Sequence, residues 1–196
     1  MERVLWVLDF DNTISHRTQY EGDIELETYQ DGKHHYMSRS VCEFFQNEIQ
    51  NGNKVVLLTA RRRELYERIH MPFQVSKAIT SFGAYQYDYD AKPSPDPKPY
   101  LPAHKLPHRR GYVLEDNVFY RALERDKDGR KVYVIPDGLG KDKAIQKLKT
   151  EYPTYKIIAI GDDPIYDGVM SPFADKCFVG GYKPDLMTYL VNKKVV

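Results

Sequence analysis

The chain has 196 residues, enough for one domain that carries an inserted module. Its 29 basic and 28 acidic residues give a formal net charge of +1, which argues against a general affinity for nucleic acid or anionic membranes. Two cysteines are too few for a disulfide framework, and no apolar stretch approaches membrane-spanning length. We therefore expect a cytoplasmic protein without nucleic acid or membrane partners, and composition leaves the oligomeric state unknown.

The first predicted element is a buried strand at residues 4–8, which runs directly into the motif DFDNT at residues 9–13. A short apolar run is typical of a parallel strand, and open α/β sheets bind ligands beyond the carboxyl ends of their strands. Because side chains alternate along an extended chain, Asp9 and Asp11 are expected on the same side. Two carboxylates held that close repel each other, and Mg²⁺ is the usual remedy.

The next elements alternate in type along the chain. Residues 24–29 and 34–37 predict a β-hairpin beside the same edge, in which the adjacent His34 and His35 face opposite ways and are interpreted as hairpin surface. Helices are predicted over residues 40–52 and 61–70, the second ended by Pro72. Residues 55–58 predict a second buried strand, and residues 78–80 predict a weaker one.

The pattern changes after residue 81 and then becomes regular again. Six prolines between residues 91 and 107 predict an extended loop, and turn chemistry at residues 128–129 leads into a strand at 131–135. Residues 84–137 are therefore predicted to be an inserted, β-rich cap module. Helices at 141–152 and 184–191 and strands at 157–160 and 177–179 complete a core of residues 1–83 and 138–196. We expect an α/β fold with a doubly wound, Rossmann-like parallel sheet.

Polar side chains follow three of the predicted strands, and basic ones open the helix at residue 141. They are Asp9 and Asp11; Thr59; Asp162, Asp163 and Asp167; and Lys141 and Lys143. Because the carboxyl ends of parallel strands share one edge of a sheet, we expect these groups to converge. Two Asp after a strand are commonly only a capped turn, but the ordered combination favours a phosphoryl-transfer site.

This layout resembles the haloacid dehalogenase-like (HAD) hydrolases. Their motifs correspond to DFDNT at 9–13, to Thr59 after an apolar strand, to Lys141 at a helix start and to GDDPIYD at 161–167. Residues 79–88 resemble the cap entry of the sucrose-phosphatase and Cof-type sugar-phosphate phosphatases, with Phe82 in place of Asn. KDKAI at 141–145 resembles their K-G-x-A-L motif and favours Lys141 over Lys143. The predicted cap is shorter than is usual in that branch.

Both the resemblance and the chemistry imply roles for these residues. Asp9 is expected to be the nucleophile that forms an aspartyl-phosphate, and Asp11 the general acid and base. Thr59 is expected to bind a phosphoryl oxygen, and Lys141 to neutralise charge. Mg²⁺ is expected on the Asp9 carboxylate, the Asp11 backbone carbonyl and a carboxylate of the group Asp162, Asp163 and Asp167, with the first two of that group equally suited.

Three functions remain open at this point. The first is a Mg²⁺-dependent phosphatase that acts on a small phosphorylated metabolite, a sugar phosphate by the resemblance. The second is a nucleic-acid-end phosphatase, which the neutral net charge disfavours. The third is a signalling module that accepts a phosphoryl group on Asp9 without turnover. Arg61 is a candidate for binding the substrate anion, with a solvated helix start as the alternative.

Overall fold

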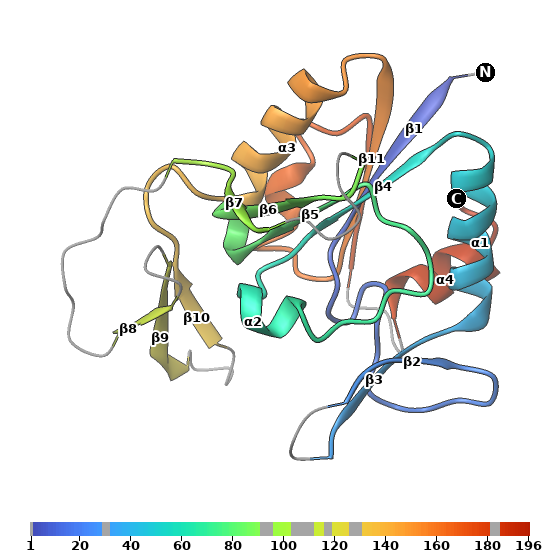
Figure 1. The fold of residues 1–196 in the computed structure, drawn as a ribbon, viewed down its shortest axis with the longest axis horizontal. Coiled ribbons are helices and arrows are strands. Elements are labelled where there is room, and N and C mark those ends of the chain that lie inside the picture. The colour runs from blue at the N-terminus through green and yellow to red at the C-terminus, as the bar shows by residue number, and fades with distance from the viewer. Residues whose placement is uncertain are drawn as a thin grey trace.

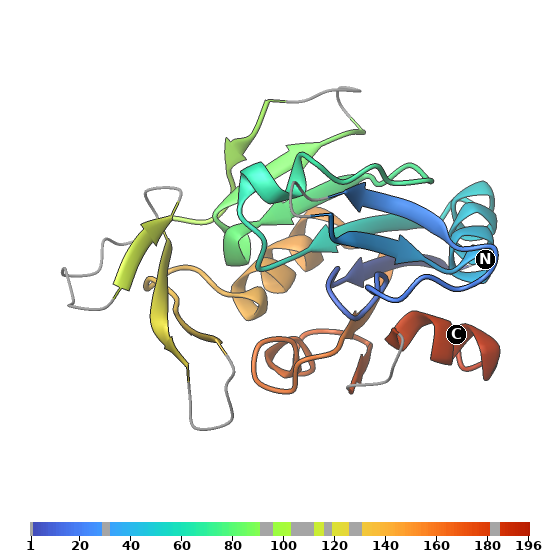
Figure 2. The same ribbon diagram turned by 90° about the horizontal axis from the view of Figure 1, so that it is seen from below.

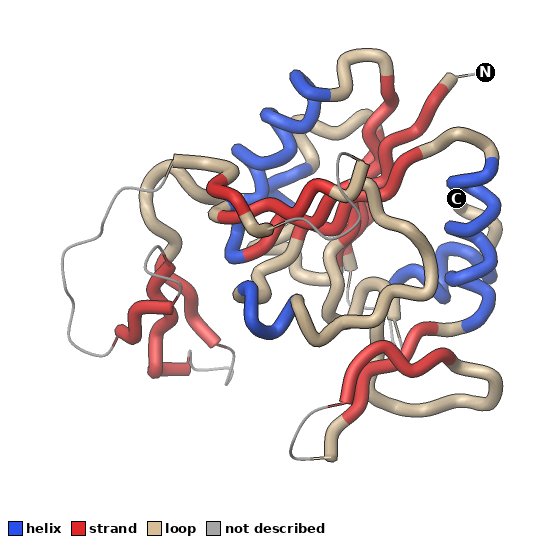
Figure 3. Tube along the Cα trace, viewed as in Figure 1, coloured by secondary structure: helices blue, strands red, loops and turns tan. Residues whose placement is uncertain are grey.

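The structure is a computed structural model that describes residues 2–28, 32–90, 96–102, 112–115, 119–125, 131–180 and 185–196. Figures 1 and 3 show its helices and strands. The strands are β1 (Arg3–Leu8), β2 (Ile24–Thr28), β3 (His34–Met37), β4 (Lys54–Leu58), β5 (Lys77–Thr80), β6 (Tyr85–Asp88), β7 (Lys98–Pro99), β8 (Tyr112–Glu115), β9 (Phe119–Arg125), β10 (Lys131–Val134), β11 (Tyr155–Gly161) and β12 (Lys176–Val179). The α-helices are α1 (Arg39–Gln50), α2 (Arg63–Tyr66), α3 (Lys141–Glu151) and α4 (Leu186–Asn192).

The central sheet has seven strands in the order β12-β11-β1-β4-β5-β6-β7. The pairs from β12 to β5 are parallel, and β6 and β7 extend the sheet in antiparallel fashion. β1 lies between β4, which follows it closely in the sequence, and β11, which comes much later in the sequence (Figure 1). Strand order therefore reverses at β1, and open α/β sheets bind their ligands at such a reversal.

The strands of this sheet are buried on both faces. In β1, Trp6 and Leu8 pack in the core that contains α1 and α4, whereas Leu5 and Val7 pack in the core that contains α3. Strands covered on both sides need continuous apolar runs rather than alternating ones, which is the pattern of residues 4–8. The predicted doubly wound parallel sheet is confirmed.

The helix predicted over residues 61–70 is wrong in extent. Only α2, Arg63–Tyr66, is helical there. Before α2 the backbone of Arg61 is outside the helix and its side chain is buried, and after α2 the His70 N–H donates to the Leu26 carbonyl at 2.8 Å. Tertiary contacts at both ends thus override the helical periodicity of the sequence.

The predicted hairpin is confirmed, since β2 and β3 pair in antiparallel fashion, while residues 29–31 of its turn lie outside the described residues. The pairing carries a register shift between Glu25 and Glu27, which marks a β-bulge. Backbone hydrogen bonds in both directions between His16 and Tyr36, at 2.9 and 2.8 Å, connect β3 to the loop after β1. The hairpin is therefore held against the carboxyl edge of the central sheet.

A second, three-stranded antiparallel sheet has the order β10-β9-β8 and stands apart from the central sheet (Figure 2). β6 and β7, which fall within the predicted module of residues 84–137, belong to the central sheet. The division into core and module at these boundaries stays a prediction. Most of the predicted proline-rich loop and the turn at 128–129 lie outside the described residues. Among the described helices, none combines the length and the apolar character needed to cross a membrane.

Candidate active site

The polar residues that follow β1, β4 and β11 meet the start of α3 around one cavity. Its volume is about 220 Å³. It is lined by Asp9, Asp11, Asn12, Thr59, Ala60, Phe82, Lys141, Asp162, Asp163, Tyr166 and Asp167. Residues that are far apart in the chain thus converge at the carboxyl edge of the sheet, as the motif order predicts.

A buried ion cluster forms the floor of this cavity. Lys141 Nζ donates to Asp9 Oδ1 at 2.6 Å and to Asp167 Oδ1 at 2.5 Å. The Lys141 side chain is only 2% exposed, and both carboxylates are buried with it. A Cβ on Gly161 would lie 2.3 Å from Asp167 Cγ, so glycine is needed there for Asp167 to reach the cluster. Lys143, on the exposed side of α3, takes no part in this cluster.

The loop after β1 is shaped by its own backbone. The Phe10 carbonyl lies within hydrogen-bond distance of the N–H groups of Thr13, Ile14 and Ser15, at 3.4, 3.2 and 3.1 Å, and Asn12 adopts a positive φ of 57°. Asparagine tolerates this left-handed conformation better than most residues. The tight turn brings the Thr13 hydroxyl back to Asp9 Oδ2 at 3.3 Å. It therefore fixes the carboxylate at the end of β1.

Burial and the neighbouring charges together shift the pKa values of the residues in this cluster. Burial raises the pKa of Asp9 above its usual range, although Lys141 opposes the shift. Burial alone would lower the pKa of Lys141, but Asp167 and Asp9 raise it above its ordinary value. Burial, with the Asp167 charge beside it, raises the pKa of Asp162 to about 6. The negative charges of the carboxylates around the cavity therefore outnumber the one positive charge in the cluster, that of Lys141.

Three of the carboxylates are placed to share a cation. Oxygen atoms of Asp9, Asp162 and Asp167 lie within 4.8 Å of one another. With Lys141 the group has three negative charges and one positive, a formal charge of −2, and a carboxylate-only donor set suits Mg²⁺. Asp163 is not in this group: its Oδ1 accepts from the backbone N–H of Ile165, at 2.7 Å, and of Tyr166, at 3.2 Å. The geometry therefore favours Asp162 over Asp163.

The carboxylate of Asp11 is turned to Arg61 rather than to the acidic group. Arg61 Nε and Nη2 donate to its two oxygens at 2.8 and 2.7 Å, and Asp11 remains 42% exposed. Burial would raise the pKa of Asp11, but the hydrogen bonds and charge of Arg61 outweigh it and lower the pKa. The pair holds Asp11 as a carboxylate, the form that can accept a proton from water.

Arg61 itself does not line the cavity. Its guanidinium also donates from Nη1 to Glu27 Oε2 at 2.5 Å, and its Nη2 lies 3.3 Å from His35 Nδ1. The interpretation of the two adjacent histidines as hairpin surface is wrong for His35, which is 2% exposed. Sequence reasoning missed Glu27 and His35 as neighbours of the site, because their burial depends on how the hairpin pairs and packs.

Three further residues of the cavity wall, Asn12, Phe82 and Tyr166, were not predicted to be site residues. The Phe82 ring packs against the Tyr166 ring with centroids 5.5 Å apart. Asn12 Nδ2 donates to Asp162 Oδ2 at 3.4 Å. Asn12 and Tyr166 stand inside the two acidic motifs, so their closeness to the site follows from the motif positions alone.

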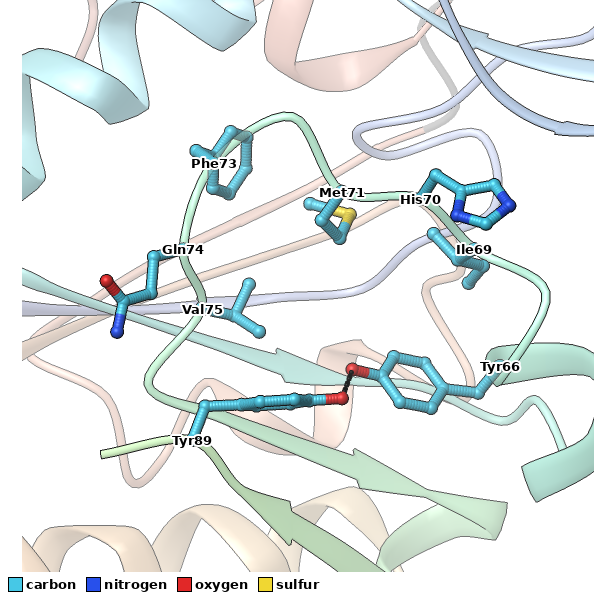
Figure 4. A pocket seen from close by; sticks show the side chains of 8 residues that line it. All are labelled: Tyr66, Ile69, His70, Met71, Phe73, Gln74, Val75 and Tyr89. Carbon is cyan, nitrogen blue, oxygen red and sulfur yellow. Dashed lines mark hydrogen bonds between the residues drawn. The ribbon is translucent and has the colours of Figure 1, made fainter. Parts of the chain in front are cut away.

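A larger cavity, of about 650 Å³, lies between α2 and the segment that leads to β5 (Figure 4). It is lined by Tyr66, Ile69, His70, Met71, Phe73, Gln74, Val75 and Tyr89, with a hydrogen bond of 2.8 Å between the two tyrosine hydroxyls. No carboxylate or lysine lines it. The smaller cavity is the better candidate, because phosphoryl chemistry needs charged groups more than volume.

Comparisons with known proteins bear on the fold. No protein-family model and no curated protein matches the chain. Among solved structures, Thermoplasma acidophilum 0175 matches with a TM-score of 0.56 and 12% identity over 100% of both chains. BT1666 from Bacteroides thetaiotaomicron, from a study of phosphatases of the haloalkanoate (HAD) superfamily, has a TM-score of 0.57 and 13% identity over 99% of this chain and 96% of that one.

A third match is the IMP-bound IMP-nucleotidase of Plasmodium falciparum, with a TM-score of 0.55 and 8% identity over 99% of this chain and 68% of that one. The chain shares their fold. At these identities the likeness concerns the fold, and it confirms at that level the resemblance to the HAD hydrolases.

Proposed function

We propose that this chain is a Mg²⁺-dependent phosphatase that hydrolyses a small phosphomonoester through an aspartyl-phosphate. The observation that carries the proposal is the buried cluster in which Lys141 bonds both Asp9 and Asp167 at the end of β1. A carboxylate at a strand end, paired with a buried lysine and facing a cavity, has the arrangement of a nucleophile prepared for an anionic substrate. The shared fold with HAD phosphatases supports the same reading.

In the proposed reaction Asp11 first takes a proton from solvent, when the phosphate anion binds beside it. The Asp9 carboxylate then attacks phosphorus, and the bond to the leaving oxygen breaks as Asp11 gives that oxygen its proton. Asp11 then takes a proton from water, which attacks the aspartyl-phosphate, releases phosphate and restores Asp9. Lys141 stabilises the negative charge at the nucleophile throughout. Thr59 Oγ1 accepts from the Arg61 N–H at 3.1 Å, which leaves its own proton for a phosphoryl oxygen.

The acidic residues provide for a cation. The Asp9, Asp162 and Asp167 carboxylates fit Mg²⁺ by charge and donor type, and we propose the Asp11 carbonyl as a further ligand. When bound, Mg²⁺ neutralises charge on the phosphoryl oxygens. Uncatalysed phosphate-ester hydrolysis is among the slowest of biological reactions, so an enzyme needs this neutralisation beside the lysine.

We propose a sugar phosphate as the substrate. A cavity of about 220 Å³ favours a small phosphomonoester, and the cap-entry and K-G-x-A-L resemblances belong to sugar-phosphate phosphatases. The sheet of β8–β10 is the proposed cap, which would exclude water from the cavity when it closes over it.

The proposal is tested by phosphate release from a panel of phosphorylated sugars with the full chain and Mg²⁺. Turnover that is lost in EDTA and in Asp9→Asn supports it. Absence of turnover with every small phosphomonoester refutes it. Activity confined to phosphorylated oligonucleotides would indicate a nucleic-acid-end phosphatase, and stoichiometric phosphorylation of Asp9 without release would indicate a signalling module.

A further inference from the structure

We propose that the β2–β3 hairpin supplies a positioning residue, Glu27, which holds the guanidinium of Arg61 and through it the carboxylate of Asp11. The inference rests on the proposed function, because it concerns the group that would serve there as general acid and base. Neither the motifs nor the structural matches assign a role to this hairpin.

The three side chains form a chain of charge-assisted hydrogen bonds from the interior to the cavity. Arg61 uses Nε and Nη2 for Asp11, at 2.8 and 2.7 Å, and Nη1 for Glu27 Oε2, at 2.5 Å. The Glu27 side chain is 0% exposed and that of Arg61 5%. Because the guanidinium is planar, fixing one edge on Glu27 fixes the direction of the edge that binds Asp11.

The hairpin reaches this position through its bulge. Glu25 pairs with Tyr36 and Glu27 pairs with His35, so Leu26 is the extra residue on β2. Regular alternation would place Glu25 and Glu27 on the same face. The bulge instead leaves Glu25 exposed beside His34 and turns Glu27 inward, and re-aiming of a side chain is a known use of bulges next to active sites.

Stability alone does not account for this arrangement. A buried ion pair is commonly no more stabilising than apolar residues of similar volume, since both charges lose their water. Within the described part of the chain, Glu27 Oε1 has no hydrogen-bond partner. The guanidinium also lies over the Phe10 ring, 4.4 Å from its centroid, which restricts its movement. These features constrain orientation, which is what a proton-transferring carboxylate requires.

The test compares two substrates that differ in their need for a proton on the leaving group. A hexose phosphate has a poor alkoxide leaving group, whereas 2,4-dinitrophenyl phosphate has one that departs unprotonated. In Glu27→Gln, with Mg²⁺, we expect kcat/KM for the hexose phosphate to fall about 10- to 100-fold and that for dinitrophenyl phosphate to change less than about threefold. Glu25→Gln, on the same strand but exposed, is the matched control and should change neither.

Equal losses on both substrates, or none, would overturn the inference, because a merely structural role does not discriminate between leaving groups. If Glu27→Gln does not fold, as judged by circular dichroism melting, Arg61→Lys takes its place in the test. Lysine keeps the positive charge but cannot bridge the carboxylates of Asp11 and Glu27 in one plane. The same selective loss of kcat/KM for the hexose phosphate is therefore expected. If the wild type turns over both substrates and the variants leave the ratio of their kcat/KM values unchanged, the inference is refuted and the proposed function is not. No wild-type turnover of either substrate refutes the proposed function, and the inference with it.

Discussion

Replacing Lys141 by methionine removes the ammonium group that two buried carboxylates share. Methionine has a similar length, so the substitution deletes the charge and leaves little empty space. The hydrogen bonds lost are those from Nζ to Asp9, at 2.6 Å, and to Asp167, at 2.5 Å. The two carboxylates would then lie buried beside each other without a counterion.

Removing one partner of a buried ion pair costs about 3–5 kcal/mol. Protonation of Asp9 relieves part of the repulsion, so we expect the low end, about 3 kcal/mol, which for a chain of this size is a fall in Tm of about 6–12 °C. Lowering the pH should reduce the loss, since protonation removes the uncompensated charge. Activity should fall at least about 10²-fold, because a protonated Asp9 is a poor nucleophile.

Thermal unfolding followed by circular dichroism at pH 7 in EDTA measures the first effect, and phosphate release with Mg²⁺ measures the second. Lys143→Met is the matched control, because Lys143 is two residues away on α3 and exposed. A Lys141→Met protein as stable as Lys143→Met would refute the assignment of Lys141 as the shared counterion of a buried cluster.

Three further predictions concern the metal, a thiol and the core. Asp162→Asn should weaken Mg²⁺ binding at least about tenfold in calorimetric titration and Asp163→Asn less than about threefold, whereas equal effects would contradict the acidic group defined by the structure. Burial raises the pKa of the Cys177 thiol to about 11, so in Cys42→Ser its alkylation by iodoacetamide should rise about tenfold per pH unit from pH 8 to 10; a plateau below pH 9 would count against it. Phe45→Ala should lower the free energy of unfolding in urea by about 3–5 kcal/mol, since this ring is fully buried in α1; a loss below about 1 kcal/mol would mean that the core repacks.

The central sheet could be predicted because its physics is local. Strands buried on both faces need unbroken apolar runs, and residues 4–8, 55–58 and 157–160 have them. The extent of α2 could not be predicted from the sequence, because the backbone hydrogen bond between His70 and Leu26 joins segments that are distant in the chain. β6 shows the same limit: its polar residues 85–88 do not suggest a place in the central sheet, which they take by pairing with β5.

Some features of the candidate site could likewise be predicted from the sequence, and others could not. That the groups at residues 9, 59, 141 and 167 lie together follows from strand order, since each stands at the same edge of the sheet. The choice between Asp162 and Asp163 does not follow, because adjacent residues differ only in how their loop turns. The bulge at Leu26 depends on pairing between two strands. The periodicity of the sequence alone therefore assigns Glu27 to the wrong face of the hairpin.

Phe82 is an exception to the rule that residues other than glycine avoid a positive φ. Ser81 and Phe82 have φ values of 51° and 56°, a conformation that costs a residue other than glycine about 1–2 kcal/mol. The backbone of Phe82 donates to the Thr59 carbonyl at 3.3 Å and accepts from the Gly140 N–H at 2.8 Å. One strained residue thereby joins the end of β4 to the start of α3, the segments that carry Thr59 and Lys141. Asparagine adopts a positive φ at less cost than phenylalanine does, so in this chain the buried Phe82 ring and its contact with Tyr166 must offset the additional strain.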